Sequence, residues 1–235
     1  MANGVLVFAG MRVGVLDGDL TVHEDQTGAA SAHLVLSTAY NVLPLWLRIA
    51  NDELVRAKAA SVEIASLFST TDDETKRQLL LAELGPSMQV AMACGVALDA
   101  LFNLLQPYAK LSYTEKKTKR PAQIAETIKR VYKVTNVQMA ELKQKIEDIL
   151  SYRGKVAHPS FKLQRACDRE DISVGVDWKF SLYRYSNARQ CFLTTMKPVG
   201  HFCERKSGVR DVDDEMGRIA DALVHLNLIK RNASS

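Results

Sequence analysis

The sequence has few cysteines, a start that makes a poor signal peptide, and a longest apolar stretch that is broken by polar residues, and these features argue against several classes of protein. None of the four cysteines in the 235 residues falls in a C-x-x-C pair or at metal-finger spacing, so we expect reduced thiols and no metal. No basic residue precedes the apolar start of the chain, which argues against a signal peptide. The apolar stretch at 34–50 contains Pro44 and Arg48 and is too short and too polar to span a bilayer. We therefore expect a cytoplasmic protein with no membrane partner.

Glycine-rich phosphate loops, internal repeats and low-complexity tracts are also missing, so the sequence predicts no cofactor. Hydrophobic residues make up 47% of the chain and charged residues 25%, which is ordinary for a soluble globular protein. The length suits one domain with additions or two small domains. The net charge of +4 permits an anionic partner without demanding one.

The first 85 residues predict a small β element followed by helices. Weak alternation with Asp17-Gly18 at a turn predicts a hairpin over 13–22, and the small polar residues at 26–31 read as a linker. Helical spacing begins near Ala32 and extends to about Leu67, with an interruption or kink near Pro44. We therefore divide this part into residues 1–30, a hairpin and linker, and residues 31–85, the N-terminal helices.

The next two helices are predicted from strong boundary signals. The sequence Thr71-Asp-Asp-Glu74 has the form of a capping box, and Gly85-Pro86 is a typical helix end. The helix expected after Pro86 is apolar nearly all round, which indicates a central, enclosed position. Its main polar exceptions, Asp99 and Asn103, lie four residues apart and share one face. A carboxylate in such a helix needs a buried cation as a partner.

That cation is expected from the helix that precedes His158. Leu142, Ile146 and Ile149 recur at helical spacing, and Arg153 is the next member of the same stripe. Pro159 restricts the residue before it to extended geometry, so the helix should end by about His158. The sequence therefore delivers a guanidinium and an imidazole together where a helix ends, with Asp99 as the expected partner of Arg153.

The rest of the chain predicts a basic loop, a strand and further helices. Residues 110–120 form a polar loop in which charges either follow a phosphate backbone or are simply solvated. Alternation predicts a strand near 172–182, and helical spacing returns at 188–202 and after the caps at 211–214. Trp46 and Trp178 are expected in the core. The basic residues considered for RNA binding are Lys110, Lys116, Lys117, Lys119, Arg120 and Lys155.

The spacing Arg153-x4-His158, followed by Pro159, resembles the HEPN family (higher eukaryotes and prokaryotes nucleotide-binding), with Asp99 in an A-L-x-A-L context as a further point of similarity. The resemblance covers about 86–161 and departs at Gly154, where ribonuclease members usually carry a polar residue. It implies a HEPN-like core at 86–161 in a helical domain of residues 86–235. Together with the N-terminal hairpin and the 172–182 strand, which are predicted above from alternation, we expect a mainly α-helical bundle with a small β addition.

The resemblance also implies a function. HEPN ribonucleases of toxins and phage-defence systems cleave RNA without a metal, by attack of its own 2′-OH. Arg153 and His158 would be catalytic, with Asp99 and Asn103 in support. The family habit further implies a homodimer, and an antitoxin or another protein is a further expected partner. Two alternatives stay open, and Gly154 favours both. One is a non-catalytic nucleotide-binding or interaction module, and the other is a plain dimerisation scaffold.

Overall fold

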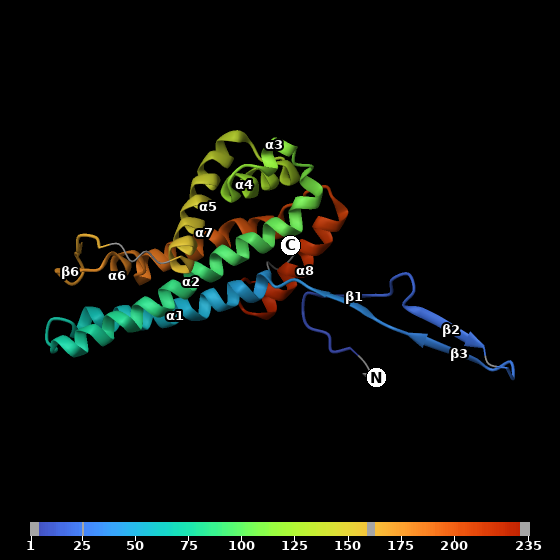
Figure 1. Cartoon of the computed structure of the whole chain (residues 1–235), viewed down its shortest axis with the longest axis horizontal. Helices are drawn as coiled ribbons and strands as arrows, with labels where there is room; N and C mark the ends of the chain where they lie inside the picture. The colour runs from blue at the N-terminus through green and yellow to red at the C-terminus, as the bar shows by residue number, and fades with distance from the viewer. Residues whose placement is uncertain (1–4, 25, 159–162, 231–235) are drawn as a thin grey trace.

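The computed structural model describes residues 5–24, 26–158 and 163–230, with the side chains of 136–138 excepted, and it is mainly α-helical with a small β addition, as expected. Two long antiparallel helices form one side of the molecule, shorter helices pack against their middle, and a β ribbon projects from one end (Figure 1). The helices of this range are α1 (Leu43–Leu67), α2 (Asp73–Ala109), α3 (Tyr113–Lys116), α4 (Arg120–Tyr132), α5 (Asn136–Ala157), α6 (Trp178–Leu182), α7 (Tyr185–Glu204) and α8 (Arg210–His225).

Helix α2 is the central element of the fold. The helix end expected at Gly85-Pro86 is wrong. Helix α2 continues through Pro86 without a break, so the segment boundary placed after residue 85 falls inside a helix. The local signal fails because α1 packs along α2 on both sides of this point, and burial of that face outweighs the lost backbone hydrogen bond. The N-cap is Asp72, whose carboxylate accepts from the Thr75 amide at 2.9 Å, and not Thr71.

The main core forms where α2 meets α1, α4, α5 and α7. Helix α2 packs directly against α5, as the expected pairing of Asp99 with Arg153 requires. Helix α2 is also long and apolar enough to cross a membrane, but 56% of its most apolar window is buried within the bundle, as in a core helix. The four cysteines are free, and burial raises the pKa of both Cys94 and Cys191 to about 12.

The N-terminal β addition is a two-stranded ribbon, and the hairpin expected at 13–22 is wrong. Met11–Gly14 (β1) pairs with Ser37–Tyr40 (β4), and Leu20–Glu24 (β2) pairs with Ala30–Leu34 (β3). Asp17-Gly18 makes a turn where the chain passes from one pair to the next, and the described part of the true hairpin connection is residues 26–29, within the expected linker. The helical pattern expected from Ala32 is wrong up to Val42, whereas the expected helix to about Leu67 is confirmed by α1, which begins beside Pro44. The boundary after residue 30 falls inside β3. Pairing between distant segments has outweighed the local turn signal.

The strand expected near 172–182 is mostly wrong. Only Val174–Val176 (β6) is extended, and it pairs with Cys167–Arg169 (β5), while Trp178–Leu182 forms α6. A buried ion pair holds this hairpin against α2. Arg169 donates to Glu83 at 2.6 Å and to Asp171, and Glu83 also accepts from the Tyr185 amide at the start of α7. Burial lowers the pKa of Arg169, and the carboxylates of Asp171 and Glu83 together more than reverse this effect.

Candidate functional site

Two arginines share the carboxylate of Asp99, in the middle of α2. Arg153 of α5 donates from Nη1 to Oδ2 of Asp99 at 2.5 Å, which confirms the expected pair. Arg120, the first residue of α4, donates from Nε to Oδ1 at 2.9 Å. The guanidinium of Arg120 also lies over the ring of Phe102, 4.1 Å from its centroid. The ion pairs of Asp99 thus link both α4 and α5 to the central helix α2.

Charge and exposure set what this cluster can bind. Two guanidiniums and one carboxylate carry a net charge of +1. The Arg153 side chain is 35% exposed, so the pair is not sealed from solvent. Within the described part of the chain, Nη1 is the only nitrogen of Arg153 with a hydrogen-bond acceptor, which leaves donors for an incoming ligand. The arrangement suits an oxyanion such as a phosphate group.

Gly95, one turn before Asp99 on α2, makes the approach of Arg153 possible. A Cβ at this position would lie 2.6 Å from Cδ and 2.9 Å from Cβ of Arg153. The arginine stem therefore crosses α2 over a residue without a side chain. Gly95 was not among the residues predicted from the sequence; the available signal was its position four residues before Asp99, on the same helix face.

The end of α5 is held by a second contact. Tyr183, which is buried between α6 and α7, donates its hydroxyl to the backbone oxygen of Tyr152 at 2.9 Å. Burial raises the pKa of Tyr183 to about 12, so the hydroxyl stays protonated and remains a donor at neutral pH. Arg153 is thus positioned from α2 on one side and from the α6–α7 connection on the other.

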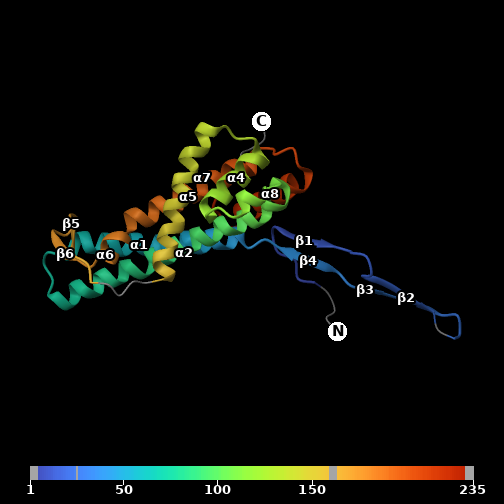
Figure 2. The ribbon, with the colours of Figure 1, turned by 45° about the horizontal axis from the view of Figure 1, so that its top comes forward.

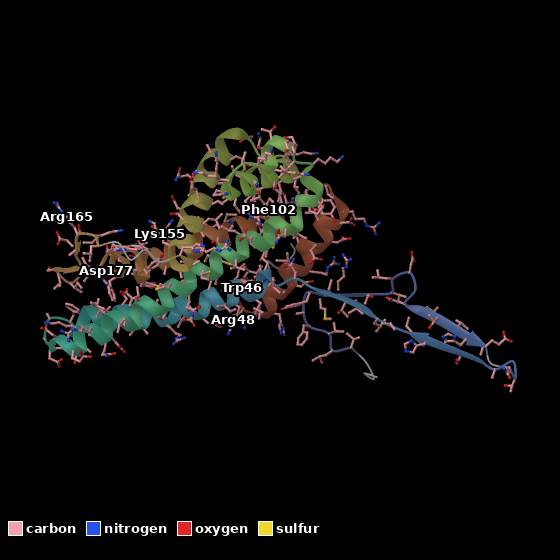
Figure 3. All side chains as sticks on the ribbon, in the orientation of Figure 1. Trp46, Arg48, Phe102, Lys155, Arg165 and Asp177 are labelled. Carbon is pink, nitrogen blue, oxygen red and sulfur yellow. The ribbon has the colours of Figure 1, made fainter. Side chains whose placement is uncertain are left out.

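His158 is the C-cap of α5, and its amide donates to the Gly154 oxygen at 2.9 Å. Its exposed side chain lines a cavity of about 240 Å³ together with Lys155, Gln164 and Trp178. Trp178 is therefore partly exposed and is not the core residue that was expected. Figure 3 labels Lys155 at the end of α5, with Arg165 and Asp177 along the chain beyond it. A cation, an imidazole and an aromatic ring meet at this helix end.

Arg153 and His158 belong to one helix and its C-cap, and no hydrogen bond joins their side chains among the described residues. Five helical residues correspond to about 7.5 Å along the axis. His158 has left the helix, with φ −128° and ψ 72°, so its direction is not fixed by the helical rotation. Pro159, the third member of the motif, lies outside the described residues. Gly154 has open space around its Cα, where the family pattern expects a polar side chain.

The other residues predicted for the site lie apart from Arg153 and His158 or make no contact that defines a role. Asn103 is exposed on α2, one turn beyond Asp99, and it has no hydrogen-bond partner among the described side chains. The expected basic loop contains the short helix α3, and Lys117 lies over the Tyr113 ring at 4.1 Å. No cluster of three or more His, Cys, Asp or Glu side chains suited to a metal occurs in the part of the chain that the structure describes. The exposed lysines of the loop are Lys110, Lys116, Lys117 and Lys119.

Comparisons with protein-family models, with curated proteins and with solved structures found no match to this chain.

Proposed function

We propose that this protein is a metal-independent endoribonuclease of the HEPN type, in which Arg153 and His158 act on an RNA phosphodiester. The observation that carries the proposal is the Asp99 cluster. A carboxylate shared by two arginines holds Arg153 in place and still leaves a net positive charge with accessible donors. An exposed histidine lies at the end of the same helix.

The chemistry uses the RNA itself as the nucleophile. The 2′-OH attacks the adjacent phosphorus while the bond from phosphorus to the 5′-oxygen breaks, which leaves a 2′,3′-cyclic phosphate and a free 5′-OH. His158 accepts the 2′-OH proton or protonates the departing oxygen, and such proton transfer contributes on the order of 10²–10⁴-fold. Arg153 donates to the non-bridging oxygens, where negative charge develops.

The surroundings of His158 fit a single-stranded substrate. The partly exposed ring of Trp178 offers a face for a base, and Lys155 offers a charge for a neighbouring phosphate. One histidine performs one of the two proton transfers, so a homodimer with two facing motifs would supply both. As a toxin or phage-defence nuclease, the protein would also need a protein partner, such as an antitoxin, that restrains it.

A specific observation favours a second candidate, a non-catalytic nucleotide-binding or interaction module. Asp99 already neutralises Arg153 and links it to Arg120, which is a sufficient structural reason for all three residues. Gly154 supplies no side chain beside Arg153. In this case the protein binds RNA or a nucleotide without cleaving it.

The test is cleavage of end-labelled RNA by purified protein in the presence of a chelator. We expect cleavage of RNA and none of DNA of the same sequence, with cyclic phosphate ends. His158→Ala and Arg153→Lys should suppress cleavage. The matched controls are His225→Ala, at the last residue of α8, and Arg56→Lys, which is exposed on α1, and both should keep activity. RNA binding without any cleavage would overturn the nuclease and leave the binding module.

A further inference from the structure

The β1–β4 ribbon, residues 11–40, carries an apolar face that nothing in the described chain covers. In the outer half, Leu20 lies opposite Leu34 and Val22 opposite Ala32, all on one face. Thr21, His23, Ser31 and His33 occupy the other face. The side chains of Leu20, Val22 and Leu34 are 53–64% exposed, although apolar residues of this size are usually buried. The ribbon is therefore amphipathic with its apolar side in solvent.

Such a ribbon is unstable as an isolated element. A two-stranded hairpin is marginal in water unless it packs on something else, and its outer edges leave backbone groups unpaired. Among the described residues of the ribbon, only those at its base are held by α8. A Cβ at Gly10 would lie 2.9 Å from Cβ of Ala222 and 3.0 Å from the backbone oxygen of Arg218, so α8 comes close to the chain just before β1. The side chain of Asn41, just after β4, donates to Glu215 of α8. The outer half extends away from the bundle in both views (Figures 1 and 2).

The charge of the ribbon indicates which surface covers it. Residues 11–40 contain one arginine and four carboxylates, a net charge of −3. Because the whole chain carries +4, the other residues carry +7. Two ribbons packed face to face would bring together two surfaces of the same sign. A basic surface with an apolar floor is the complementary one.

A groove between α5 and α7 has this character. Its volume is about 360 Å³, and its floor includes Leu142, Leu193 and the buried ring of Phe202. Its rim carries Lys145, Lys197 and Arg205, together with Glu141, which pairs with Lys145. The side chain of Lys197 is exposed. We name this surface the α5/α7 groove.

We propose that the ribbon of one copy of this chain docks, by its apolar face, in the α5/α7 groove of a second copy. Reciprocal docking gives a closed two-fold dimer in which both ribbons are covered. The ribbon leaves its own bundle at α8 and points away from it, so the groove it occupies belongs to the partner. This dimerisation through the N-terminal ribbon is independent of any RNA cleavage.

The experiment is sedimentation of the full chain at micromolar concentration, with variants in the ribbon and in the groove. The ribbon variant is Leu20→Ser with Val22→Ser and Leu34→Ser, and its matched control is Val55→Ser with Val62→Ser, which removes equally exposed apolar groups from α1. The groove variant is Lys197→Glu, with Lys58→Glu on α1 as its control. Circular dichroism of each variant checks that the helices are intact.

We expect a dimer whose dissociation constant rises about tenfold or more in both variants. The ribbon variant removes the apolar side chains that fill the groove, and the groove variant places a carboxylate at the rim against a ribbon of the same sign. Both controls should stay within about twofold of the wild type. Mixed copies carrying Val22→Cys or Lys197→Cys should form a disulfide between these two positions, identified by mass spectrometry. A monomeric wild type, a ribbon variant that keeps the dimer, or a bond between two copies of residue 22 without one from 22 to 197 would each overturn the proposal.

Discussion

Removing the carboxylate of Glu83 should destabilise the protein more than any other single charge deletion that we consider. Arg169 is 1% exposed and Glu83 is 1% exposed, and their charged groups are 2.6 Å apart. The perturbation is Glu83→Leu, which replaces the carboxylate with an apolar side chain of similar size and leaves the guanidinium of Arg169 buried. It also removes the acceptor of the Tyr185 amide at the start of α7.

The magnitude follows from what remains around Arg169. Breaking a fully buried pair from one side costs about 3–5 kcal/mol, because the remaining charge is left without compensation. Asp171 still accepts from Arg169 at 2.9 Å, so the lower end, about 3 kcal/mol, applies here. Asp171→Ala should cost less, because its side chain is 44% exposed and water replaces part of its contribution. Glu83→Leu combined with Arg169→Met should recover most of the loss, since no charge stays buried.

The assay is urea unfolding followed by circular dichroism, analysed as a double-mutant cycle. A free energy of unfolding for Glu83→Leu within about 0.5 kcal/mol of the wild type would refute the reasoning, because that is the size of an ordinary surface change. A double variant as unstable as the sum of the two single variants would also refute it, since the two side chains would then be independent.

Three further predictions concern the site and its surroundings. Asp99→Asn should cost about 1–2 kcal/mol in urea unfolding, less than a sealed pair, because Arg153 and Arg120 are 35% and 42% exposed; no measurable loss would contradict this. Gly95→Ala should impair RNA cleavage as much as Arg153→Lys does, because the added Cβ displaces the side chain of Arg153. Gly85→Ala, on the same helix but with open space around the added Cβ, should leave cleavage intact. Equal cleavage activity in the two glycine variants would contradict this reasoning. The pKa of Asp72 is lowered by the Thr75 amide and that of Asp171 by Arg169. The stability that these two carboxylates give to the folded protein should be fully present above the ordinary carboxyl pKa. It should be lost as the pH falls through their lower pKa in the folded state. Asp72→Asn should flatten this acid loss in unfolding measured from pH 5 to 2.

The parts of the fold that were predictable depend on local periodicity. The helical spacing of Ile146 and Ile149 predicted which face of α5 packs on the core, and Arg153 continues that face. The pairing of Asp99 with Arg153 was also predictable, because a carboxylate in the apolar part of α2 requires a cation as its partner. Both arguments need only the residues of one helix and the cost of an unpaired charge.

The parts that were not predictable depend on contacts between distant segments. Gly85-Pro86 has the sequence of a helix end, but packing of α1 along α2 keeps the helix continuous. Asp17-Gly18 has the sequence of a hairpin turn, but β1 pairs with β4 instead. The pair of Arg169 with Glu83 joins residues 86 positions apart, and no local pattern indicates it. The role of Gly95 likewise appears only once α5 is placed across it.

The most direct test of the proposed function is the chemistry of the RNA ends that the purified protein produces. RNA with a single 2′-deoxy substitution at the preferred cleavage position is compared with the unmodified RNA in the presence of a chelator. We predict a 2′,3′-cyclic phosphate and a 5′-OH from the unmodified RNA, no cleavage at the substituted position, and loss of both products with His158→Ala but not with His225→Ala. Cleavage that continues at the 2′-deoxy position, or activity that survives His158→Ala, would contradict the assignment of Arg153 and His158.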